Sequence, residues 1–96
     1  MSVAFVPDDG SEHGPTGPAQ VTAPPRFAYG VGRRVGPAVV RNRVRRRLRA
    51  AAREIVRDEG GLPSGAYLVT VRPEAVALDY ASLRRDLAVA CRAASA

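Results

Sequence analysis

The 96-residue chain has no lysine and a single cysteine, Cys91. One cysteine cannot build a disulfide framework or a cysteine-based zinc site, which is typical of a reducing compartment. No apolar run is long enough to span a membrane, and the first nine residues lack the basic start of a signal peptide. We therefore expect a cytoplasmic protein with no membrane partner. The absence of lysine is more typical of genomic codon bias than of function, although arginine is the better ligand for phosphate.

The chain also lacks the parts of a self-sufficient catalyst. His13 lies in a Gly- and Pro-rich stretch, and Asp8 and Asp9 are neighbours in a polar turn. No pattern resembles a spaced metal cluster, a nucleophile with its base or a phosphate-binding glycine loop. We predict no catalytic residue and no metal ligand in the protein itself.

Positive charge is concentrated in one block. Residues 26–57 contain eleven arginines and one acid, Glu54, whereas residues 1–25 carry −3 and residues 58–96 carry −1, which gives the net charge of +6. Six of these arginines fall within residues 41–49. Solvated helix faces usually mix both signs, so a block with almost no acid indicates an anionic partner such as nucleic acid.

Hydrophobic periodicity predicts one domain of three strands and two helices. The expected elements are a strand at residues 3–6, a flexible Gly- and Pro-rich loop at 8–25, a strand at 26–34, a helix at about 36–58, a strand at 66–72 and a final helix that begins after the N-cap Asp79. In the second strand the bulky residues Phe27, Tyr29 and Val31 alternate with a nearly bare face. That face either packs tightly inside the domain, which we favour, or admits an RNA backbone or a helix.

The long helix separates its residue types by side. An apolar stripe consists of Val40, Val44, Leu48, Ala51 and Ile55. The opposite side carries Asn42, Arg46, Arg49 and Arg53, while Arg43 and Arg45 project sideways and Arg41 and Arg47 border the stripe. A narrow stripe rich in Val and Ala favours docking on a sheet over insertion into a membrane surface. The final helix has its own stripe of Tyr80, Leu83, Leu87, Ala90 and Cys91, which makes Cys91 a core residue.

Residues 35–49, with Arg41, Asn42 and Arg43 in a Val-Gly context, resemble the arginine-rich signature of the bacterial ribonuclease P protein component. Residues 62–73 and the Leu78, Asp79, Tyr80 run fit the same family, so the resemblance covers about residues 26–93, and residues 3–8 fit more weakly. It implies an α+β fold over residues 1–96. This fold is a two-layer α/β sandwich with a mixed sheet and a left-handed βαβ crossover, as in the second domain of a ribosomal protein.

The resemblance also implies a function. The family's protein is an accessory to a catalytic RNA subunit that removes the 5′ leader of precursor tRNA. It binds that RNA, helps retain Mg²⁺ held mainly by the RNA, and holds the leader in a cleft on the sheet. The RNA-binding candidates are Arg33, Arg34, Arg41, Asn42, Arg43, Arg45, Arg46, Arg49 and Arg53. Phe5 and Tyr29 are the candidates for contacting the leader, because aromatic faces stack on unpaired bases.

The sequence departs from the family pattern at its start. Family members usually begin with a helix that forms one wall of the leader cleft, whereas this chain starts at the first expected strand. We expect either a coding start upstream of Met1 or a shortened form. Pro37 also replaces a common Asn, which is harmless at a helix start.

Two other functions stay open at this point. One is a general RNA-binding or ribosome-associated module of the same fold. The other is a protein-only nuclease, which the missing metal carboxylates disfavour.

Overall fold

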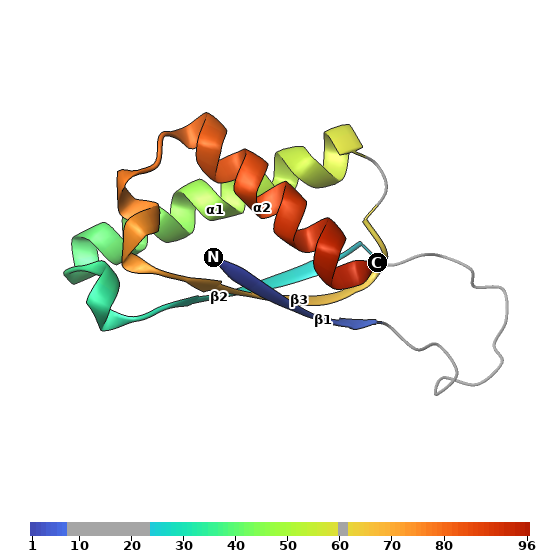
Figure 1. Ribbon diagram of the computed structural model, residues 1–96, viewed down its shortest axis with the longest axis horizontal. Helices are drawn as coiled ribbons and strands as arrows, with labels where there is room; N and C mark the ends of the chain where they lie inside the picture. Colours follow the sequence, from blue (N-terminus) through green and yellow to red (C-terminus); the bar gives the residue numbers. More distant parts are fainter. Residues whose placement is uncertain (8–23, 60–61) are drawn as a thin grey trace, which may run out of the picture.

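The computed structural model describes residues 1–7, 24–59 and 62–96. Three strands form one sheet: β1 (Ser2–Pro7), β2 (Arg26–Val31) and β3 (Gly65–Val71). Two helices, α1 (Ala38–Glu59) and α2 (Tyr80–Ser95), lie on the same face of this sheet (Figure 1). The expected α+β sandwich is confirmed. The expected loop at residues 8–25, with His13, lies almost entirely outside the described residues.

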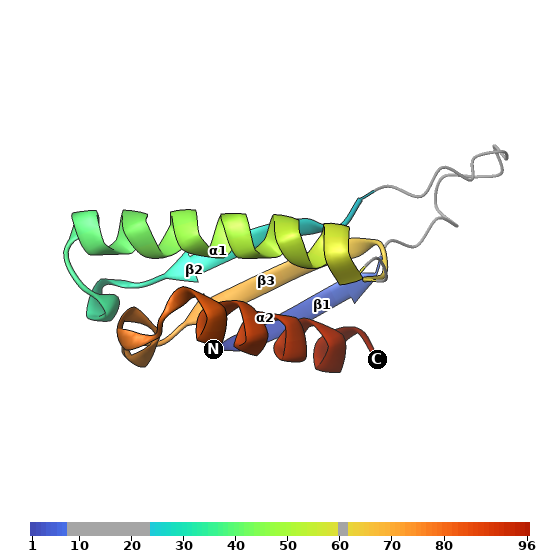
Figure 2. The same cartoon turned by 90° about the horizontal axis from the view of Figure 1, so that it is seen from above.

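The sheet is mixed, with strand order β1-β3-β2. β3 pairs antiparallel with β1, placing Val3 beside Val69, and parallel with β2, placing Tyr29 beside Val69. α1 connects the parallel pair. Viewed from the helix side with both strands pointing upward, β3 lies to the left of β2 (Figure 2). The crossover is therefore left-handed, as the resemblance implies and against the usual preference.

β2 is shorter than the alternation predicts. It ends at Val31, and residues Arg33–Val35 turn into a 3₁₀ helix, η3, in which the Val35 amide donates to the Gly32 carbonyl at 3.1 Å. The strand prediction was wrong for its last three residues, because burying Val35 against the core requires the chain to turn there.

The bare face of β2 also differs from our favoured interpretation. Ala28 and Gly30 are exposed, while Phe27, Tyr29 and Val31 point toward the helices. The prediction that the bare face packs tightly inside the domain is wrong, because both helices cover the other side of the sheet. The uncovered side also exposes about half of Leu68.

α1 docks through its predicted stripe. Val44, Leu48, Ala51 and Ile55 are buried, and Val40 is half-buried. Ala52 is buried as well, although we did not predict it. The helix begins after Pro37, whose carbonyl accepts the first helical hydrogen bond, as expected for proline at a helix start.

α2 completes the core. The Asp79 carboxylate accepts a hydrogen bond from the Ser82 amide at 2.8 Å, which confirms the predicted N-cap. Leu83, Leu87 and Cys91 are buried as predicted. A short 3₁₀ helix, η4 (Pro73–Ala77), precedes α2 and had no counterpart among the expected elements. Among the described residues, no helix has the length and apolar character needed to cross a bilayer.

Candidate nucleic-acid interface

The exposed side of α1 is a continuous row of cations. Asn42, Arg46, Arg49 and Arg53, which we predicted to face away from the sheet, are exposed, and so is Arg43, which we expected to project sideways. Within residues 1–7, 24–59 and 62–96, none of these four arginines pairs with an acid. Unneutralised guanidinium groups on a rigid helix are well suited to phosphate. We call this row, Asn42 to Arg53, the arginine ridge.

The three other arginines of residues 41–49 each donate a hydrogen bond to a nearby group of the protein. Arg41 Nε donates to the Gly36 carbonyl at 3.1 Å. Arg47 donates to the Leu78 carbonyl at 3.0 Å, which joins α1 to the loop before α2. Arg45 donates to the Asn42 side chain at 3.2 Å. All three are half-buried, so packing orients them before any RNA arrives.

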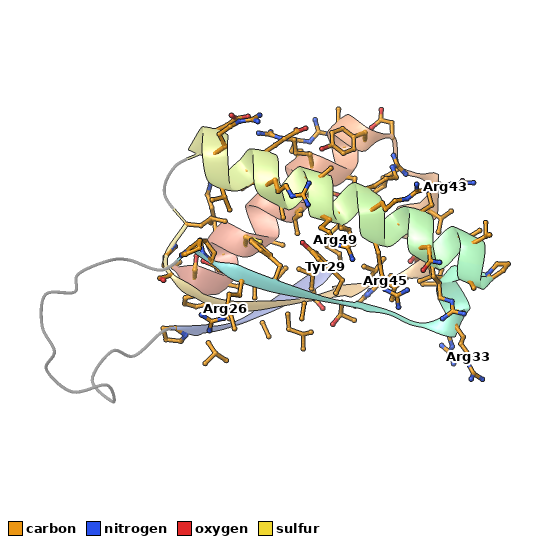
Figure 3. The ribbon with its side chains drawn as sticks, turned by 180° about the vertical axis from the view of Figure 1, so that it is seen from behind. Arg26, Tyr29, Arg33, Arg43, Arg45 and Arg49 are labelled. Atoms are coloured by element: carbon orange, nitrogen blue, oxygen red, sulfur yellow. The ribbon has the colours of Figure 1, made fainter. Side chains whose placement is uncertain are left out.

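Arg33 and Arg34 extend the positive surface beyond the start of α1. Both lie in η3 and both are exposed. Figure 3 shows Arg33 beyond the end of β2, with Arg43 and Arg45 on the adjacent part of α1. The predicted RNA-binding residues thus lie along α1 and in the turn before it, with the Arg41 side chain hydrogen-bonded back to Gly36. Their role in binding RNA stays a prediction.

Two acids of α1, Glu54 and Asp58, contact an arginine of α2. Arg84 of α2 contacts Glu54 at 3.1 Å and Asp58 at 3.2 Å. Arg57 also donates to Asp58 at 2.9 Å, and this hydrogen bond lowers the pKa of the Asp58 carboxyl. The charges of Glu54 and Asp58 are therefore paired with Arg84 and Arg57 and not with the arginine ridge.

The two leader candidates both lie on the helix-facing side of the sheet. Phe5 packs its ring on Tyr67, with centroids 4.7 Å apart. A Cβ at Gly65 would lie 2.6 Å from the Phe5 ring and 2.5 Å from the Val6 carbonyl oxygen, and Gly65 has a φ of +152°. Only glycine fits there, so the backbone of β3 can approach the Phe5 ring closely. The contact of Phe5 and Tyr29 with a leader stays a prediction.

Among the described residues, no group of three or more His, Cys, Asp or Glu is placed to hold a metal ion. Burial raises the pKa of the Cys91 thiol to about 11, so this side chain stays a neutral core residue. Arginines, with a few aromatics, are the side chains with a candidate function.

Sequence reasoning did not name Phe27 among the candidate site residues. Phe27 and Tyr29 line one hollow together with Arg49 and Arg53. The spacing indicates each pair separately, because alternate strand residues such as Phe27 and Tyr29 share a face, and helix residues four apart such as Arg49 and Arg53 share a side. The sequence does not show that this strand face and this helix side lie next to one another.

Comparison with known proteins places the chain in a family. The ribonuclease P family matches residues 3–95. The ribonuclease P protein component of Thermobifida fusca is 47% identical over 95 residues, covering 97% of this chain and 59% of that protein. The Salinispora tropica component is 46% identical over 82 residues, covering 84% and 58%. That of Thermus thermophilus is 45% identical over 67 residues, covering 70% and 38%.

The chain spans about three-fifths of the length of the first two of these relatives. The match nevertheless includes all three strands, the arginine ridge and both helices. On this evidence the chain belongs to the ribonuclease P protein family.

Proposed function

We propose that the chain is the protein subunit of ribonuclease P and acts beside a catalytic RNA in the cytoplasm. The observation that carries the proposal is the arginine ridge, in which Arg43, Arg46, Arg49 and Arg53 are exposed and have no acidic partner within the described residues. The apolar side of α1 packs on the sheet, so these arginines lie on a helix that is fixed in place. Such a surface binds RNA through phosphates and loses affinity steeply with salt.

In this proposal the RNA subunit performs the cleavage. The described side chains do not form a carboxylate cluster that fits Mg²⁺, so we assign the metal to the RNA. The protein supplies positive charge where two RNA molecules approach one another. Arg33 and Arg34 lie in the turn before α1, and Arg33 extends this charge toward the open face of the sheet (Figure 3). We place the 5′ leader of precursor tRNA on that open face, and this placement excludes Phe5 and Tyr29 as its contacts, because both lie on the helix-facing side.

Cleavage of precursor tRNA provides the test. The substrate is incubated with a bacterial ribonuclease P RNA at low Mg²⁺, with and without the protein, and the 5′ products are resolved on a gel. We expect the protein to stimulate accurate 5′ cleavage. RNA binding without stimulation would contradict the proposal and favour a general RNA-binding role, and cleavage without the RNA subunit would indicate a protein nuclease.

A further inference from the structure

An aromatic hollow lies between the edge strand β2 and the C-terminal half of α1. It encloses about 480 Å³, within the range of small-molecule sites, and is open to solvent. Phe27 and Tyr29 form its floor, and Ala52 and Val56 of α1 form its inner wall. We call it the β2–α1 hollow.

The floor of the hollow is rigid. The Phe27 and Tyr29 rings are nearly parallel, with an interplanar angle of 6° and centroids 6.3 Å apart. Behind them, Tyr67 stacks on Phe27 with centroids 5.0 Å apart. Burial raises the pKa of the Tyr29 hydroxyl to about 12, so it remains a neutral donor at physiological pH. Aromatic rings that are already held in place lose little entropy when a planar ligand stacks on them.

The rim of the hollow is cationic. Arg49 and Arg53 are one turn apart on α1, about 6 Å along the helix axis, and both are exposed. Both side chains line the hollow together with Tyr29, and their positive charge opposes the rise in the Tyr29 pKa. Figure 3 shows Arg49 and Tyr29 next to one another between α1 and β2.

We propose that the β2–α1 hollow binds one unpaired nucleotide of the RNA that docks on α1. The base stacks on Tyr29 and Phe27, and Arg49 and Arg53 hold the adjoining phosphates. Aromatic faces bordered by unpaired cations suit a base with its phosphates, whereas a purely apolar ligand gains nothing from the cations. This inference rests on the proposed function, because it names a subsite for that RNA.

The position of the hollow identifies the source of the nucleotide. Arg49 and Arg53 belong to the arginine ridge, so the hollow continues the surface assigned to the RNA subunit. It lies on the helix side of the sheet, whereas the open face assigned to the leader lies on the other side. We therefore assign Tyr29 to the RNA subunit and not to the leader.

A tryptophan reporter tests stacking directly. The chain has no tryptophan, so Tyr29→Trp places a single indole in the hollow. The probes are an oligoadenylate of about eight nucleotides, which is within the usual site size for single strands, and an abasic oligomer with the same number of phosphates. We expect the oligoadenylate to quench the indole emission and the abasic oligomer to leave it unchanged. Equal responses to both probes would overturn the proposal.

Two matched variants measure the contribution of the ring. We expect the unmodified protein to bind the oligoadenylate roughly 5- to 150-fold more tightly than the abasic oligomer, which is the effect of stacking one base. Tyr29→Leu should remove this preference without changing the salt dependence, and Tyr29→Phe should keep it. A preference that survives in a folded Tyr29→Leu protein would contradict the assignment. If Tyr29→Leu does not fold, the tryptophan reporter decides the question.

Binding measurements with the RNA subunit and with precursor tRNA test which of the two supplies the nucleotide. Tyr29→Leu should weaken binding to the RNA subunit and leave unchanged the effect of leader length on binding of precursor tRNA. The opposite result would place the nucleotide in the leader and overturn this assignment. Base-dependent quenching without any stimulation of tRNA processing would refute the proposed function while confirming the stacking subsite.

Discussion

α1 and α2 lie side by side on one face of the sheet, yet their arginines have different environments (Figure 2). Arg84 of α2 contacts two acids of α1 and holds the helices together. Arg46 and Arg49 of α1 are exposed with no acidic partner among the described residues. The position of nearby carboxylates, and not the residue type, therefore decides whether an arginine is paired within the protein or left available to an external anion.

The largest expected effect comes from placing a charge under the ridge. Leu48 is completely buried, so Leu48→Asp should prevent folding, because an unpaired buried carboxylate costs several kcal/mol against a marginal stability. Circular dichroism during heating measures this. Val39→Asp is the matched control on an exposed position of the same helix and should melt cooperatively. A cooperative transition for Leu48→Asp would mean that α1 is docked through another side.

An intermediate effect comes from removing two ridge arginines. Arg46→Ala combined with Arg49→Ala should preserve the fold and weaken RNA binding at low salt. If each arginine contacts one phosphate, the slope of log affinity against log salt should fall by about 1.4 to 1.8. Affinities measured between 50 and 200 mM salt provide the slope. Arg85→Ala combined with Arg92→Ala removes the same charge from α2 and should change the slope little. Equal slopes for both double variants would contradict the proposal that RNA binds to the arginine ridge and not to the arginines of α2.

The smallest expected effect comes from the arginine between the helices. Arg84→Ala should lower the melting midpoint by no more than about 8 °C, because partly exposed ion pairs contribute little. Calorimetry measures the midpoint, and added salt should reduce the difference from the unmodified protein. We expect the salt slope of RNA binding to be unchanged. A larger loss of RNA affinity than that of the Arg46 and Arg49 variant would reverse the comparison between the helices.

Local chemistry explains why most of the secondary structure could be predicted. A helix repeats every 3.6 residues, so the Val44 and Leu48 stripe and the outward-facing Arg46 follow from spacing alone. The Asp79 cap likewise depends on an amide three residues away. β2 was predicted three residues too long, because alternation continues through Gly32 while the burial of Val35 bends the backbone.

The sequence by itself determined the helices, the alternation of the strands, the charge of the block and, through its resemblance, the family. Only the tertiary structure decided which faces meet. The exposed Ala28 and Gly30, the partners of Arg84 and the joining of Tyr29 with Arg49 all depend on strand order and on a left-handed crossover. These features are set by packing between residues far apart in the chain, and no local periodicity encodes that packing.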